Sequence, residues 1–133
     1  LAAIRAADVI ICPTRPAPFE LDSMPSTAKL LDLAQRRHLA LTVLNGVTPN
    51  QAAAKEYEYA TRKLAGLGLR IGTKWISNRK PIVEALELGK GITEVKAATA
   101  KASADEFKAL WEELHLLVPN QISNVVPIAG GRS

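Results

Sequence analysis

Short apolar runs alternate along the chain with longer segments in which apolar residues recur every three or four positions. The runs at residues 9–12 and 39–44 are almost continuously apolar, and a weaker run interrupted by Gly72 follows at 69–76. Runs of this length with no polar face are typical of strands buried on both sides, as in a parallel sheet. Since helical segments separate them, we predict an α/β fold with helices on both faces of the sheet.

Four segments with helical periodicity also carry residues that begin or end helices. We predict helices over residues 23–37, 48–68, 79–89 and 103–118. Ser23 precedes Pro25 as an N-cap, and Ser103 and Glu106 have the spacing of a capping box, as do Thr48 and Gln51. Glycines at 66, 68 and 89 mark helix ends. Residues 92–95 are expected to be a short extended segment. Residues 1–8 have the pattern of the last turns of a helix, so we expect a piece of a longer protein.

The segment that follows the first predicted strand is stiff. It reads PTRPAP, residues 13–18, and proline cannot donate a hydrogen bond to a sheet, so we expect the strand to end before Pro13. Asn45-Gly46 and the stretch SNRKP (77–81) follow the other two predicted strands. Ligands of parallel sheets bind at the carboxyl ends of the strands. These three strand ends are therefore the candidate binding region.

The basic residues are distributed unevenly. The net charge is +4, but the stretch between Tyr59 and Val83 holds six basic residues and no acidic one. A surface that binds polyanions is one interpretation, because clustered cations release counterions from a phosphate backbone, and a solvated basic face is the other. The single Cys12, the absence of a secretory signal and the lack of any apolar run of about 18 residues favour a cytoplasmic protein without a membrane span.

The chain lacks motifs of common enzyme chemistry. It contains no GxxxxGK[ST], GxGxxG or GxSxG segment, and the histidines His38 and His115 are isolated. The neighbouring carboxylates Glu112 and Glu113 lie on a predicted helix, where we expect a solvated face. We assign no catalytic residue and no metal site, and on its own residues the chain is not a complete enzyme.

Three segments of the chain are AADVIICPTRPAPFELD (6–22), LTVLNGV (41–47) and ISNRKPIVEALELGKGITE (76–94). Together they resemble ParA/MinD-type ATPases, with the best fit to small plasmid-partition ParA proteins. The resemblance spans about residues 3–118. It implies the C-terminal portion of a Rossmann-like P-loop NTPase domain over 1–118. Residues 119–133 have no periodicity, so we expect a flexible tail there or a segment used in an intermolecular contact. The deviant Walker A loop of the family lies upstream of the matching part, so this chain should not hydrolyse ATP by itself.

The resemblance also implies a function and partners. Members bind ATP and Mg²⁺, form homodimers around the nucleotide, coat DNA without sequence preference and are stimulated by a ParB-like centromere-binding protein. The implied location is cytoplasmic and nucleoid-associated. Two alternatives stay open: a non-enzymatic α/β module that binds nucleic acid or protein, and a MinD-like positioning protein. A membrane-targeting amphipathic helix would favour the latter, and residues 119–133 lack its basic, periodic face.

Residue roles follow position by position from the resemblance. Asn45 matches a base-contacting asparagine, while an Asn-Gly turn is the alternative. Ser77, Asn78 and Arg79 match the loop over base and ribose, although the family often has proline where this chain has Ser77. For Arg79 there are two alternatives: it binds a carboxylate, or it faces DNA. Thr14, Arg15 and Pro16 match a loop at the dimer interface, with surface packing as the alternative. The candidate DNA-phosphate contacts are Arg62, Lys63, Arg70, Lys74, Lys80 and Lys90.

Overall fold

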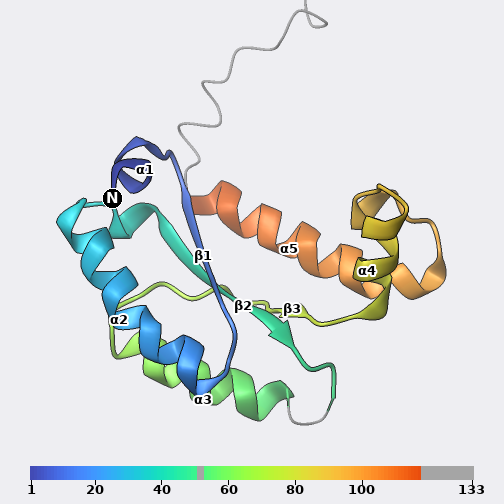
Figure 1. Cartoon of the computed structure of the whole chain (residues 1–133), viewed down its shortest axis with the longest axis horizontal. Coiled ribbons are helices and arrows are strands. Elements are labelled where there is room, and N and C mark those ends of the chain that lie inside the picture. Colours follow the sequence, from blue (N-terminus) through green and yellow to red (C-terminus); the bar gives the residue numbers. More distant parts are fainter. Residues whose placement is uncertain (51–52, 118–133) are drawn as a thin grey trace, which may run out of the picture.

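The computed structural model describes residues 1–50 and 53–117 (Figure 1). Strands and helices alternate along this part of the chain, as the hydrophobic pattern predicts. The helices and strands are α1 (Ala2–Ala6), β1 (Ile10–Thr14), α2 (Pro18–Leu33), β2 (Ala40–Val47), α3 (Ala53–Ala65), β3 (Ile76–Ser77), α4 (Lys80–Glu87) and α5 (Lys101–Leu117). Short 3₁₀ turns cover Arg37–Leu39 (η1), Ile92–Glu94 (η2) and Ala98–Ala100 (η3). Residue 51, part of one predicted capping box, and the predicted tail 119–133 lie outside the described residues.

The three strands form one parallel sheet in the order β1-β2-β3. Ile10 pairs with Ala40 and Thr14 with Leu44, so β1 lies beside β2 over its whole length. On the other side of β2, Asn45 pairs with Ile76. The prediction of an α/β fold with a parallel sheet is confirmed.

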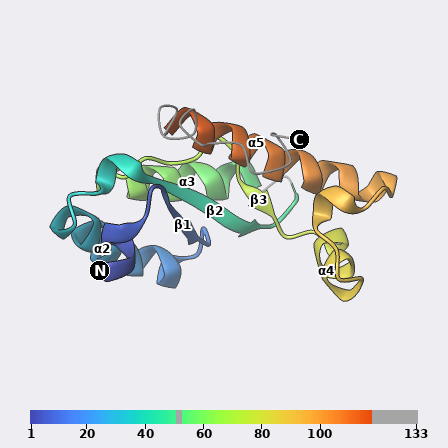
Figure 2. The same ribbon diagram turned by 90° about the horizontal axis from the view of Figure 1, so that it is seen from above.

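Helices cover both faces of the sheet. On one face, Ala40 and Leu44 of β2 pack in a core with Leu31 of α2 and Leu64 of α3. On the other, the alternating residues Leu41 and Val43 pack against Leu114 of α5. Figure 2 shows α2 and α5 on opposite sides of the strands. Burial on both faces explains why β2 carries almost no polar residue before its end.

The predicted end of the first strand is wrong. Strand β1 continues through Pro13, which pairs with Val43, and ends at Thr14. Within the described chain β1 pairs only with β2, and an edge strand tolerates proline because only one of its sides needs N–H donors. Pro13 therefore lies within the strand, one residue before its end, and does not terminate it.

The second strand also runs further than predicted. It passes through Asn45 and Gly46 to Val47, which is fully buried against α2 and α3. Gly46 has a φ of 69°, and the pairing with β3 shifts between Asn45 and Val47. A glycine with positive φ is typical of a β-bulge, which bends a strand without ending it. The Asn-Gly pair here makes a bulge, not a turn.

The third strand is shorter than the predicted run 69–76. Only Ile76 and Ser77 form a strand, and Ile71 makes an isolated bridge to Thr42. Between these points the chain leaves β2 at buried Gly72, whose N–H donates to the Thr42 carbonyl at 2.8 Å. The run contains a glycine and three polar residues, so it cannot pack continuously. The predicted extended segment at 92–95 is also wrong, since residues 92–94 form a 3₁₀ turn.

Two predicted helix starts are wrong. Helix α2 begins at Pro18, and Ser23 lies inside it, donating its hydroxyl to the Glu20 carbonyl at 2.6 Å. A proline at the first helical position needs no N–H partner, and Pro18 rather than Pro25 occupies that position. Helix α5 begins at Lys101, and Ser103 is buried within its first turn.

Three helices end with the same backbone geometry, the Schellman motif, in which a left-handed residue is followed by an N–H that bonds back to the helix. In α3 and α4 the left-handed residue is a predicted glycine, Gly68 (φ 70°) or Gly89 (φ 65°). In α2 it is Gln35 (φ 55°), the one non-glycine residue with positive φ among those described. The returning hydrogen bonds are Arg36 N to Leu31 O (2.9 Å), Leu69 N to Leu64 O (3.4 Å) and Lys90 N to Ala85 O (2.9 Å).

We predict that Gln35→Gly stabilises the protein. A left-handed conformation costs a side-chain-bearing residue about 1–2 kcal/mol, which outweighs the extra unfolded-state entropy of glycine, so the free energy of unfolding should rise by about 1 kcal/mol. Urea denaturation measures the change. The matched control, Gly89→Gln, should lower stability by a similar amount, because a Cβ at Gly89 meets no atom within 4 Å and only the backbone conformation changes in cost. A loss of stability in Gln35→Gly would contradict this reasoning.

Candidate functional site

The predicted binding segments meet at the carboxyl edge of the sheet. Thr14 ends β1, Asn45 lies near the end of β2 and Ser77 ends β3. Because all three strands are parallel, the chain leaves each of them at the same edge. The convergence predicted from sequence is therefore confirmed at the level of the backbone.

A pocket of about 370 Å³ opens between the ends of β1 and β2 and the first turns of α2. It brings Thr14 and Arg15 of the proline loop together with Asn45. Its lining is mostly polar: Pro13, Thr14, Arg15, Glu20, Ser23, Met24, Thr27 and Asn45. The loop 77–79 is not part of this lining. The pocket thus joins two of the three predicted groups.

Arg15 is positioned by the bulge in β2. A Cβ built at Gly46 would lie 3.4 Å from Nε of Arg15, so the arginine side chain lies directly over the glycine. The Thr14 hydroxyl donates to the carbonyl of Arg15 at 3.3 Å, and Thr14 itself is buried. Arg15 is exposed, and its guanidinium has no partner among the described residues. Its donors are available to a ligand or to another chain.

The third group is held by α5. The N–H of Ser77 donates to Oε2 of Glu106 at 2.9 Å, and the Ser77 hydroxyl donates to Oε1 at 2.8 Å. Arg79 donates through Nη2 to the same Oε1 at 3.4 Å, which is the carboxylate contact considered as its alternative. Ser77 is 2% exposed, so its side chain faces the carboxylate rather than the pocket. The predicted capping-box role of Glu106 is wrong, because a partner distant in sequence takes its carboxylate.

A second carboxylate of α5 binds the same segment. Glu113 accepts the N–H of Thr73 at 3.1 Å with each of its oxygens, and it also accepts the Thr73 hydroxyl at 3.2 Å. The expectation that Glu113 belongs to a solvated face is therefore wrong. Glu106 and Glu113, which we call the α5 carboxylates, are two helical turns apart on one face. They hold the chain from Thr73 to Arg79 against α5. The only sequence signal for them is this seven-residue spacing.

The six candidate DNA contacts do not form one patch. Three already have acidic partners: Arg62 pairs with Glu58 (3.1 Å), Lys63 with Asp22 (3.6 Å) and Lys80 with Glu84 (3.8 Å). The other three, Arg70, Lys74 and Lys90, are exposed and make no ion pair among the described residues. In both ribbon views α4, which precedes Lys90, lies at the far end of the molecule from α3 (Figures 1 and 2).

The described residues offer no metal centre. None of them form a group of three or more His, Cys, Asp or Glu side chains. The thiol of Cys12 is buried in the core, and burial raises its pKa, which disfavours the thiolate that would bind a metal. Cys12 is a packing residue beneath α2.

The chain matches no protein-family model and no protein with a curated description. In the described part of the chain no helix has the length and apolar character needed to cross a membrane.

We predict that the α5 carboxylates contribute unequally to stability. Glu106→Ala leaves the buried N–H and hydroxyl of Ser77 without partners, and unsatisfied buried groups cost about 1–3 kcal/mol each, so the free energy of unfolding should fall by about 2–4 kcal/mol. Glu113→Ala is the matched control: Thr73 is exposed and water can replace the carboxylate, so the loss should stay below about 1 kcal/mol. Urea denaturation measures both. Equal losses would show that the burial of Ser77 does not decide the cost.

Proposed function

We propose that this chain is the C-terminal portion of a ParA/MinD-type ATPase that acts in plasmid or chromosome partition. The observation that carries the proposal is the placement of Arg15, Asn45 and Arg79 at one edge of a parallel sheet, on the strand ends that match the family's nucleotide and interface segments. The Rossmann-like P-loop assignment of the fold is part of this proposal.

The pocket beside Asn45 has the chemistry of a nucleobase site. The Asn45 side chain is exposed at the pocket, and an amide both donates and accepts, as the edge of adenine requires. The backbone of Asn45 is fixed by pairing with Ile76. Arg79 follows β3 at the same edge of the sheet, outside the pocket lining, and its Nε is buried without a hydrogen-bond partner among the described residues. The proposal makes Asn45 the base contact and Ser77–Arg79 the loop over base and ribose.

Phosphate and Mg²⁺ chemistry is assigned elsewhere. The residues at this edge include no glycine-rich loop, and no acidic cluster suited to Mg²⁺ exists among the described residues. Residues outside this sequence would have to hold the phosphates and the metal. We accordingly expect no ATP hydrolysis by residues 1–133 alone.

The proline loop is the proposed dimer contact. Thr14 is buried, while Arg15 and Phe19 are exposed, Phe19 by 89%. Prolines at 13, 16 and 18 restrict the loop before any contact forms, so little ordering entropy is lost on association. An exposed guanidinium and a large exposed apolar ring in this segment suit a protein partner, here a second copy bound around the nucleotide.

We predict that Asn45→Ala weakens ATP binding by the complete natural gene product about tenfold, the loss expected for one or two hydrogen bonds to the base. Fluorescent ATP analogues report the affinity. Ser26→Ala, an exposed change on α2 outside the pocket, is the control and should bind normally. Unchanged binding in Asn45→Ala removes the base role. A gene product without a glycine-rich lysine loop upstream of residue 1 would refute the ATPase assignment altogether.

A separate prediction concerns DNA. Binding of the intact protein to mixed-sequence duplex should fall steeply with salt, because each phosphate contact contributes about −0.9 to the slope of log affinity against log salt. Lys74→Glu with Lys80→Glu should reduce that slope by about two and weaken binding at least about tenfold. The charge-matched control reverses Lys29 and Lys108, both exposed on other helices. Fluorescence anisotropy measures the affinities, and an equal loss in both double variants would indicate a general charge effect.

A further inference from the structure

A second pocket lies at the opposite, amino-terminal edge of the sheet. Its volume is about 490 Å³, and it is formed by the end of α2, by the turn η1 that precedes β2 and by the residues before the bridge at Ile71. The lining residues are Leu31, Asp32, Gln35, Arg37, His38, Gly68 and Arg70. This pocket shares no residue with the one beside Asn45.

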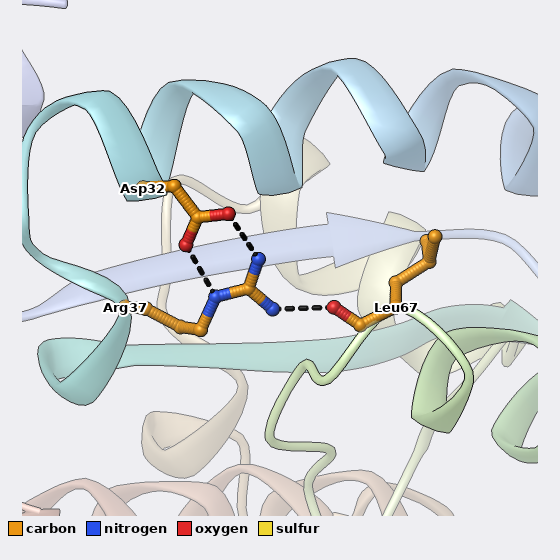
Figure 3. A network of polar contacts seen from close by, with 3 residues as sticks. All are labelled: Asp32, Arg37 and Leu67. Carbon is orange, nitrogen blue, oxygen red and sulfur yellow. Dashed lines mark hydrogen bonds and ion pairs between the residues drawn. The ribbon is translucent and has the colours of Figure 1, made fainter.

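One arginine of this pocket is fixed in orientation (Figure 3). Arg37 donates through Nε and Nη2 to the two carboxylate oxygens of Asp32, each at 2.7 Å, and through Nη1 to the carbonyl of Leu67. The hydrogen bond from Arg37 lowers the pKa of Asp32, so the pair stays ionised. A Cβ at Gly68 would lie 3.0 Å from Nη1 and would displace the guanidinium slightly, and the φ of 70° also favours glycine there. Since a guanidinium has five N–H donors, two remain for a ligand.

The other cationic groups of the pocket are uncommitted. Arg70 and His38 are exposed, and neither side chain has a partner among the described residues. Two guanidinium groups face one carboxylate, so the lining carries a net positive charge even with a neutral imidazole. Near the end of α2, the carbonyls of Leu30, Leu31 and Asp32, which would repel an anion, already accept hydrogen bonds from the N–H groups of residues 34–36.

Gln35 is an unexpected residue at this position. Its backbone occupies the left-handed conformation that glycine adopts at the ends of α3 and α4, so its side chain is retained at a cost in stability. Strain of this kind persists where the side chain has a use. The Gln35 side chain lines the pocket, where its amide can donate to an anion.

We propose that this pocket binds a phosphate group, as inorganic phosphate or as the phosphomonoester of a small molecule. Arg37 and Arg70 supply the charge, with Arg37 pre-oriented by Asp32, and Gln35 and His38 donate the remaining hydrogen bonds. The size of the pocket accommodates a small phosphorylated molecule rather than the ion alone. The proposal does not depend on the ATPase assignment, because it uses the other edge of the sheet.

The test uses inorganic phosphate and the chain of residues 1–133, with chloride at equal ionic strength as the reference. Phosphate should raise the melting temperature in a saturable manner, and it should shift the Nε–Hε resonances of Arg37 and Arg70 in NMR spectra. Arg70→Gln should weaken the affinity about tenfold or more, and His38→Gln to a smaller extent. Lys29→Gln removes one positive charge, as Arg70→Gln does, but Lys29 is exposed and lies outside the pocket, so this variant should bind phosphate normally.

Gln35→Gly separates the proposal from a purely structural role. It should raise the melting temperature without phosphate and lower the phosphate affinity several-fold, so the two readouts move in opposite directions. Equal weakening in Arg70→Gln and Lys29→Gln, or full phosphate affinity in Gln35→Gly, would overturn the proposed site. So would a mixed-sequence DNA duplex that shifts the same resonances while free phosphate does not, because that result assigns the pocket to a nucleic-acid backbone.

Discussion

The hydrogen bonds between Glu106 and Ser77 hold the carboxyl edge of the sheet together. Asn78 donates its N–H to Val47 of β2 at 2.8 Å, and the preceding N–H, that of Ser77, points the other way, to the carboxylate. An acidic side chain of α5 thereby occupies the position of a next strand, and Glu113 does the same for Thr73. With only two residues in β3, these contacts decide where the loop 77–79 lies. The position of the loop 77–79 thus depends on α5, whereas the pocket beside Asn45 is lined by residues of β1, β2, α2 and the proline loop.

The architecture was predictable because it depends on periodicity. A strand such as β2, buried on both faces, must be apolar throughout, and helices must alternate with such strands in a parallel sheet, so order and layers follow from the pattern. The meeting of residues 14–15, 45 and 77 at one edge followed from the same argument. The hydrophobic pattern does not show how the strands pair residue by residue. Asn45-Gly46 suits a turn and a bulge equally, and only the buried position of Val47 against α2 and α3 decides for the bulge.

The failures concern side chains with two competing partners. Ser103 and Glu106 have capping-box spacing, yet the carboxylate gains more from the buried Ser77 than from its own helix end, and no local rule weighs a partner 29 residues away. At the end of α2 the sequence gives no signal at all. The helix ends with the hydrogen bonds of a Schellman motif, but the left-handed residue is Gln35 and not the glycine from which such an end is predicted. Local signals were reliable where the residue has a single role, as at Gly89, where a Cβ would meet no atom within 4 Å.

Basic residues that are close together in the sequence lie at different places in the fold. Arg70 stands among the basic residues between Tyr59 and Val83, but in space it joins Arg37 and His38, which lie more than thirty positions earlier in the sequence, in a pocket at the amino edge of the sheet. Lys80 lies on α4 beyond the carboxyl edge. In a parallel sheet each helix carries the chain from one edge back to the other, so neighbours in sequence reach opposite edges. Lys74 and Lys80 do not line the amino-edge pocket that holds Arg37 and Arg70, so a variant at Arg70 tests the proposed phosphate site without changing the two lysines of the DNA prediction.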